Sequence, residues 1–267
     1  MQRNSVRYIV LFAGAVCVVC SLFVSATHVF LKSRQSANEF LDKQKKVLEV
    51  SGLIEAGAAP PREEVGRIFD ERIEMRLIDI DEGDVAGEDA GIDPATYDQL
   101  KASKDPTRSK ATESNRAQVK RIPRYAVVYE VFADAEKSEL DLRVIPVEGM
   151  GLWGTMYGFL ALDQDGVTIR GLTFYKNKET PGLGKEVENP LWKAKWPGRK
   201  AFDDEWTPVI EVIKGAAGSP EDAPHQVDGL SGATITSNGV THLLHFWLGD
   251  KGFGPYLANL RGEGSTT

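Results

Sequence analysis

Small residues and hydroxyl groups gather in the segment from Asp228 to Val240, which reads DGLSGATITSNGV. Gly232 and Ala233 present almost no side chain, so a bulky group can approach the backbone closely at this point. The hydroxyl groups within reach of such a group are those of Ser231, Thr234 and Thr236. We therefore expect this segment to bind or carry a bulky ligand.

The residues that follow predict a helix over 239–248. Apolar side chains recur there at helical spacing, at Val240, Leu243, Leu244 and Trp247. Ser237 or Asn238 is placed to cap its first turn. Unpaired backbone N–H groups and the helix dipole favour an anion at such a start, so Thr236 is well placed to carry a phosphate. Thr234 fits the same argument.

Two other segments could form part of the same site. Residues 179–184 read ETPGLG, which by itself predicts only a turn. Beside the hydroxyl segment, backbone N–H groups of this turn could approach a flat ligand, with Leu183 against a ring face and Glu179 or Thr180 at its polar edge. Residues 151–154 read GLWG, which could equally be a turn in the core with a buried indole.

The segment Ser231-Gly-Ala-Thr-Ile-Thr236 resembles the flavinylation motif of the periplasmic FMN-binding domain family, in which the last Thr or Ser is esterified to the FMN phosphate. Residues 151–154 with Met156, and residues 179–184, match the same family in the same order, and the resemblance runs from Arg121 to Leu260. It implies covalent FMN on Thr236, no catalytic side chain and no metal. It also implies a flavin pocket formed by Leu152, Trp153, Glu179, Thr180, Leu183, Gly184, Lys214, Ser231, Gly232, Ala233 and Thr234. Without the resemblance, Lys214 could equally be a solvated surface lysine.

The resemblance also implies a function. Members of the family include a subunit of sodium-translocating NADH:quinone oxidoreductases, which this chain resembles most, and a subunit of the related Rnf electron-transport complexes. It implies electron transfer between flavin or iron centres of partner subunits and quinone, and maturation by a flavin transferase. The chain has no G-x-G-x-x-G that opens a βαβ unit, so we expect NADH to bind another subunit. The alternative from another class is a membrane-anchored binding or assembly module without a redox cofactor.

Residues 8–31 carry no formal charge and are long enough to cross a hydrocarbon core of about 30 Å. They predict a transmembrane helix, within an anchor over residues 1–34. A cleaved signal peptide is the alternative, because Val24-Ser-Ala26 offers small residues for cleavage. Positive charges are more numerous after the segment than before it, and this count alone favours an orientation with the domain inside, although long domains cross membranes largely regardless of loop charge. The resemblance implies a bacterial inner-membrane protein whose soluble domain faces the periplasm.

Composition excludes one class of partner and limits the metal chemistry. The formal net charge is −7 and no basic cluster offsets the acids, which argues against nucleic acid. The two cysteines, Cys17 and Cys20, fall inside the apolar segment, where packing is the simplest role for them. His242 and His245 could share a helix face, but no neighbouring Cys, Asp or Glu completes a ligand set.

Residues 35–120 predict a stalk and a membrane-proximal lobe. Helices are expected over 33–50, ending near Gly52, and over 63–72 after two prolines. Residues 79–98 hold eight acids and no Lys or Arg, which predicts an exposed loop. Its first residues alternate carboxylates like a calcium loop, but the turn glycine is at the fifth place instead of the sixth. Residues 101–120 are expected to continue this surface segment.

Residues 121–267 are predicted to form the FMN-binding domain. Runs rich in Tyr, Phe, Val and Ile predict strands over 125–132, 140–145, 157–162, 167–175 and 208–212, with a hairpin turn at 163–166. Together with the helix after Asn238 they indicate an α+β domain with a twisted, mainly antiparallel sheet flanked by helices.

Overall fold

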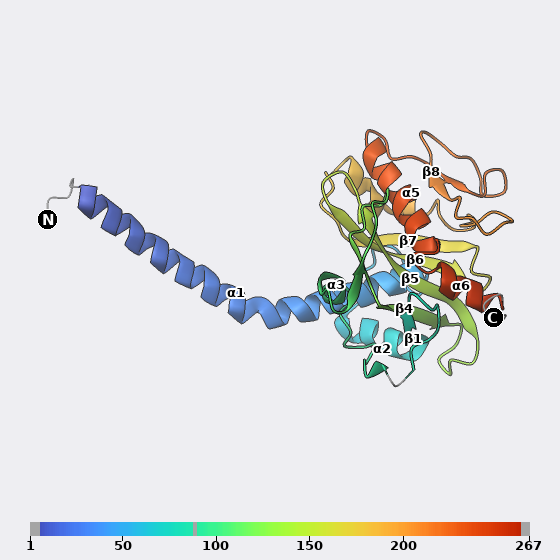
Figure 1. The fold of residues 1–267 in the computed structure, drawn as a ribbon, viewed down its shortest axis with the longest axis horizontal. Coiled ribbons are helices and arrows are strands. Elements are labelled where there is room, and N and C mark those ends of the chain that lie inside the picture. The colour runs from blue at the N-terminus through green and yellow to red at the C-terminus, as the bar shows by residue number, and fades with distance from the viewer. Residues whose placement is uncertain (1–5, 88–89, 263–267) are drawn as a thin grey trace. The chain divides into compact units, whose positions relative to one another are not determined.

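The computed structural model describes residues 6–87 and 90–262 (Figure 1). Contacts divide the chain into two compact units, with the boundary between Lys43 and Gln44. This boundary lies inside the first helix, α1, which extends over Val6–Val50. The predicted helices over 8–31 and 33–50 are therefore one continuous helix.

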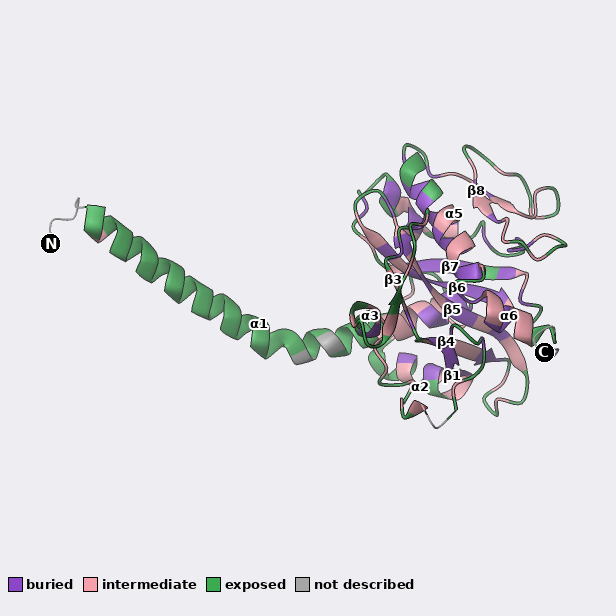
Figure 2. Ribbon diagram, viewed as in Figure 1, coloured by how far each residue is buried: buried purple, intermediate pink, exposed green. Residues whose placement is uncertain are grey.

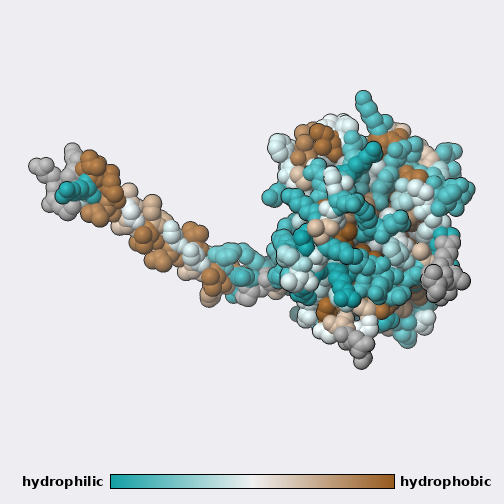
Figure 3. Space-filling model, in the orientation of Figure 1, coloured by the Kyte–Doolittle hydropathy of each residue, from teal (hydrophilic) through white to brown (hydrophobic). Residues whose placement is uncertain are grey.

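The first unit contains the apolar part of α1. Residues Val6–Lys32 are long and apolar enough to cross a membrane, and they are exposed along their length (Figures 2 and 3). Cys17 and Cys20 are both exposed on this segment. An apolar helix with all its faces exposed requires a non-aqueous environment, which agrees with the predicted single-pass anchor.

The second unit begins with the last turns of α1. Val47, Leu48 and Val50 are buried there, so this part of the helix belongs to the core of the domain. The helix ends where the N–H of Gly52 donates to the carbonyl of Glu49 and that of Leu53 donates to Leu48. Glu49 accepts hydrogen bonds from Lys46 and Lys193, which ties the end of α1 to helix α4 (Pro190–Lys193).

The centre of this unit is a five-stranded sheet with the order β1-β4-β5-β6-β7, in which every pair is antiparallel. The strands are β1 (Ile73–Asp79), β4 (Tyr125–Phe132), β5 (Leu140–Met150), β6 (Thr155–Asp163) and β7 (Ile169–Lys176). Four of them match predicted strands, and the Asp163–Gly166 turn between β6 and β7 closes as expected, with the N–H of Gly166 donating to Asp163. The fold is the predicted anchor helix followed by an α+β domain.

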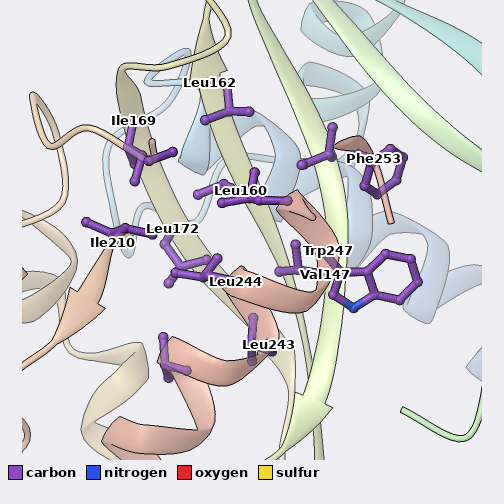
Figure 4. Packing of buried hydrophobic residues seen from close by; sticks show 14 of the residues in the cluster. Val147, Leu160, Leu162, Ile169, Leu172, Ile210, Leu243, Leu244, Trp247 and Phe253 are labelled. Carbon is purple, nitrogen blue, oxygen red and sulfur yellow. The ribbon is translucent and has the colours of Figure 1, made fainter. Parts of the chain in front are cut away.

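Side chains on the two faces of the sheet are covered by different helices. On one face, Val147 and Leu160 pack against Leu243 and Leu244 of helix α5 (Thr234–Leu248) (Figure 4). On the other face, Phe69 of helix α2 (Arg62–Arg72) makes an edge contact with Tyr129. Because side chains alternate along a strand, this arrangement buries both faces of the sheet.

The remaining elements are short and surround the sheet. They are α3 (Gln99–Lys104), β2 (Ser109–Ala111), β3 (Arg121–Pro123), the 3₁₀ helix η2 (Gly184–Glu188), α4 (Pro190–Lys193), β8 (Glu211–Val212), β9 (Gln226–Val227) and α6 (Gly254–Leu260). Strands β8 and β9 pair in parallel. Of the strand predicted over 208–212, only Glu211 and Val212 form a strand, β8.

The region before residue 121 contains two features that the sequence did not predict. Strand β1 pairs with β4, so residues 44–120 lie in the same compact unit as the rest of the domain. The acidic segment does not begin as an exposed loop, because Asp79 and Ile80 are buried. Asp79 pairs with Arg124 and Asp81 pairs with Lys110, so both carboxylates are neutralised by cations of the chain.

Candidate functional site

Helix α5 begins at Thr234, directly after Ala233, five residues earlier than predicted. Ser237 and Asn238 therefore lie inside the helix and do not cap it. The Ser237 hydroxyl instead accepts a hydrogen bond of 3.1 Å from the N–H of Leu230, which fixes the loop that leads into the helix. Thr236 lies in the first turn, where backbone N–H groups lack partners within the helix.

Thr236 and Glu179 form the centre of the site. The Thr236 hydroxyl, fully buried, donates a hydrogen bond of 2.5 Å to Glu179 Oε2. Glu179 is only 4% exposed, and its Oε1 accepts the N–H of Trp153 at 3.0 Å. The Glu179 N–H donates to Asn177 Oδ1 at 3.1 Å. One buried carboxylate thus joins the three predicted segments of the site.

Gly184 covers this pair. A Cβ atom on Gly184 would lie 2.3 Å from Glu179 Oε2 and 2.6 Å from Thr236 Oγ1, so no larger residue fits without displacing them. The turn before it is closed by the N–H groups of Leu183 and Lys185, which both donate to the carbonyl of Thr180. The glycine that ends the ETPGLG segment is therefore needed for close approach to the hydroxyl.

The end of β5 is held against α5 by backbone contacts. A Cβ on Gly239 would lie 2.4 Å from the carbonyl oxygen of Met150, and Trp247 Nε1 donates to the carbonyl of Glu148 at 2.7 Å. These contacts set the position of the Gly151–Gly154 segment relative to the start of the helix. The sequence indicated Gly239 only as the beginning of a helix, and its packing role was missed.

Apolar side chains at the surface surround the buried pair. Four of them are unusually exposed for their type: Leu152 at 42%, Trp153 at 64%, Leu183 at 44% and Ile235 at 58%. They come from the three segments that Glu179 joins. Leu183 Cδ2 lies 3.0 Å from the point that a Cβ atom added to Gly232 would occupy. Trp153 is therefore a surface residue and not a core indole. Ile235, which lies in the predicted segment 231–236 but was not named as a contact, also belongs to this apolar surface.

The other polar residues predicted for the site lie at its surface. Ser231, Thr234 and Thr180 are exposed, and Ala233 is buried next to them. Lys214 is exposed two residues after β8, whose partner β9 leads into the hydroxyl segment. Within residues 6–87 and 90–262, no hydrogen bond or ion pair links Lys214 to the other site residues, and its role remains a prediction.

Asp228, at the start of the hydroxyl segment, is ion-paired with Lys195 and accepts the N–H of Ala217 at 3.0 Å. Burial acts to raise the pKa of this carboxyl, but these hydrogen bonds outweigh it and lower the pKa.

The two histidines of α5 take separate roles. His245 Nε2 lies 2.8 Å from the carbonyl oxygen of Ile210, while burial lowers the pKa of His242.

The site has the donor set that a flavin phosphate requires. A hydroxyl in the first turn of a helix can meet a phosphate, and the helix N–H groups favour the negative charge. The exposed apolar side chains can cover a planar ring. FMN therefore fits these residues, provided that the turn over Thr236 moves, since its hydroxyl is buried beneath Gly184.

Residues 151–249 match the model of the FMN-binding domain. The chain is 46% identical to the NqrC subunit of the Na(+)-translocating NADH-quinone reductase of Vibrio anguillarum, over 98% of both chains. It is 46% identical to the corresponding subunit from Pseudomonas aeruginosa, over 97% of this chain and 98% of that one. The fold and the family match thus define an FMN-binding domain protein with an N-terminal apolar helix that fits a membrane anchor.

More particularly, the chain belongs to the NqrC family of Na(+)-translocating NADH-quinone reductase subunits. Solved structures agree with this assignment. The crystal structure of Shewanella oneidensis NqrC has a TM-score of 0.75 at 32% identity, over 85% of this chain and 99% of that one. The subunit from Parabacteroides distasonis has a TM-score of 0.65 at 26% identity, over 85% and 96% of the two chains.

Proposed function

We propose that this chain is an electron-transfer subunit of a sodium-translocating NADH:quinone oxidoreductase and carries FMN as a phosphoester on Thr236. The observation that carries the proposal is the Thr236 hydroxyl in the first turn of α5, bonded to Glu179 and surrounded by exposed apolar side chains. Near full-length similarity to the NqrC relatives favours this complex over the Rnf complex.

In this proposal each part of the site has its own task. Thr236 holds the phosphate, and the N–H groups of the first helical turn compensate its charge. Leu152, Trp153 and Leu183 cover the ring, while Thr180, Ser231 and Thr234 contact its polar edges. Lys214 supplies a positive charge at the rim. When bound, the flavin supplies the electron-transfer chemistry, and the protein determines its position and electrostatic surroundings.

The remaining parts of the proposal concern the surroundings of the chain. The apolar helix Val6–Lys32 anchors it in the inner membrane with the domain on the periplasmic side. Partner subunits supply the NADH site, the flavin and iron centres that exchange electrons with this chain, and the path for sodium. A separate flavin transferase attaches the cofactor.

Ultraviolet illumination of the denatured polypeptide on a gel tests the covalent flavin. The proposal predicts flavin fluorescence at the mass of this chain when a flavin transferase is present in the host. Absence of fluorescence under these conditions would instead support a binding or assembly module without a redox cofactor. In the purified complex, NADH:ferredoxin activity without NADH:quinone activity would favour the Rnf alternative.

A further inference from the structure

We infer that Glu179 is the catalytic base that accepts the Thr236 proton during flavin attachment, so that the substrate chain contributes a catalytic residue to its own modification. This inference rests on the proposed function. Glu179 Oε2 is 2.5 Å from the nucleophilic oxygen, and both side chains are buried. Such a short contact is typical of a hydroxyl that donates to a carboxylate.

The chemistry of attachment requires a proton acceptor at this place. A threonine hydroxyl is a weak nucleophile until an adjacent base takes its proton. Free FMN would have to expel water or hydroxide from phosphorus, so the donor must carry its phosphate as an anhydride, as in a flavin dinucleotide. Thr236 Oγ1 forms the new P–O bond while the anhydride P–O bond breaks. A nucleoside monophosphate leaves, and the hydroxyl proton passes to Glu179 Oε2.

The surroundings of Glu179 prepare it for this step. Its Oε1 is fixed by the Trp153 N–H and its backbone by Asn177, so Oε2 is directed at the hydroxyl. Once protonated, the carboxyl can donate a hydrogen bond back to the ester oxygen or the phosphate, which avoids a second negative charge beside the phosphate. Since the buried Gly184 covers the hydroxyl, it must move aside together with the exposed residues 180–183 before the donor can enter.

The test measures attachment to the full-length apoprotein, using purified flavin transferase and flavin adenine dinucleotide, by intact mass and in-gel fluorescence. Glu179→Gln keeps the shape of the side chain and can still accept the hydroxyl hydrogen bond, but it cannot take the proton. We expect attachment to be about 10²–10⁴-fold slower, the usual contribution of general base catalysis. Glu186→Gln is the matched control from the same segment, since Glu186 bonds Asn189 and not Thr236. Its rate should stay within about twofold of wild type.

A second variant separates catalysis from support of the fold. Glu179→Ala removes the carboxylate, and added formate should restore part of the attachment rate if a base is what is missing. If Glu179→Gln reacts at the wild-type rate, or if formate does not accelerate Glu179→Ala, the inference is wrong while the proposed function stands. If the wild-type chain and Glu186→Gln both lack flavin on Thr236, the proposed function itself fails and this inference fails with it.

Discussion

The Thr236 hydroxyl stabilises the buried carboxylate of Glu179, a role separate from the proposed attachment of FMN. Thr236→Ala leaves Glu179 with one hydrogen-bond donor fewer in a buried position, so we expect the free energy of unfolding to fall by about 1–3 kcal/mol. Thr236→Ser keeps the hydroxyl and should cost less. Urea denaturation of the apoproteins measures both. Thr234→Ala, at an exposed position in the same turn, is the control and should change stability by about 0.5 kcal/mol or less.

Glu148, which is not among the proposed site residues, makes the stability of the domain depend on pH. Burial raises its pKa from an ordinary value of 4.5 to about 7. The folded chain therefore holds this proton more tightly than the unfolded chain. The contribution of Glu148 to the free energy of unfolding is fully present below about pH 4.5 and is lost as the pH rises through about 7. This loss amounts to at most about 3 kcal/mol.

Comparison of urea midpoints at pH 5 and pH 8 isolates this contribution. The wild-type chain should lose more stability between these values than Glu148→Gln, whose amide cannot titrate. Parallel pH profiles for the two proteins would show that Glu148 does not carry the effect.

Among the helices and strands, residue patterns predicted best the strands that are dominated by aromatic and β-branched residues. β4 was predicted over its observed range, because Tyr, Val and Phe dominate it. β1 was missed although Ile73, Met75 and Leu77 alternate with charged residues, since the acidic run after it suggested a loop. The start of α5 was misplaced because Thr234 and Thr236 have low intrinsic helix propensity, which tertiary contacts overcome.

In the site, too, the sequence predicted segments better than it predicted contacts between side chains. Family motifs predicted which segments meet, and the structure joins Thr236, Glu179 and Trp153 through hydrogen bonds. The bond between Thr236 and Glu179 could not be predicted, because it depends on how β7 and α5 place residues 57 positions apart. Ile235 lies in the predicted segment 231–236, but its exposure could not be predicted, because it follows from the register of the helix and not from its residue type.

The turn before η2 should tolerate no side chain at Gly184. Gly184→Ala places a methyl group 2.3 Å from Glu179 Oε2, so we expect loss of stability by about 1–3 kcal/mol through overpacking, and little flavin attachment. Gly66→Ala is the control, because nothing lies within 4 Å of its Cβ position in helix α2. It should stabilise the apoprotein by about 0.5–1 kcal/mol. Equal stability of the two variants would contradict the close packing at Gly184.

At the scale of the whole molecule, the boundary between Lys43 and Gln44 predicts where the anchor can be removed. A chain that starts at Gln44 should be folded and soluble without detergent. A chain that starts at Leu53 lacks Val47, Leu48 and Val50, each buried and worth about 1.5–3 kcal/mol, so it should be unfolded or far less stable. Circular dichroism and thermal melting distinguish the two. Equal melting of both would show that the end of α1 contributes little to the core.

Mass spectrometry of the tryptic peptide 215–251 tests the attachment of FMN to Thr236 most directly. In protein purified from a host with a flavin transferase, the peptide should carry one FMN, and fragmentation should place it on Thr236. The Thr236→Ala peptide should be unmodified. An unmodified wild-type peptide, or FMN located on Thr234 or Ser231, would contradict attachment to Thr236.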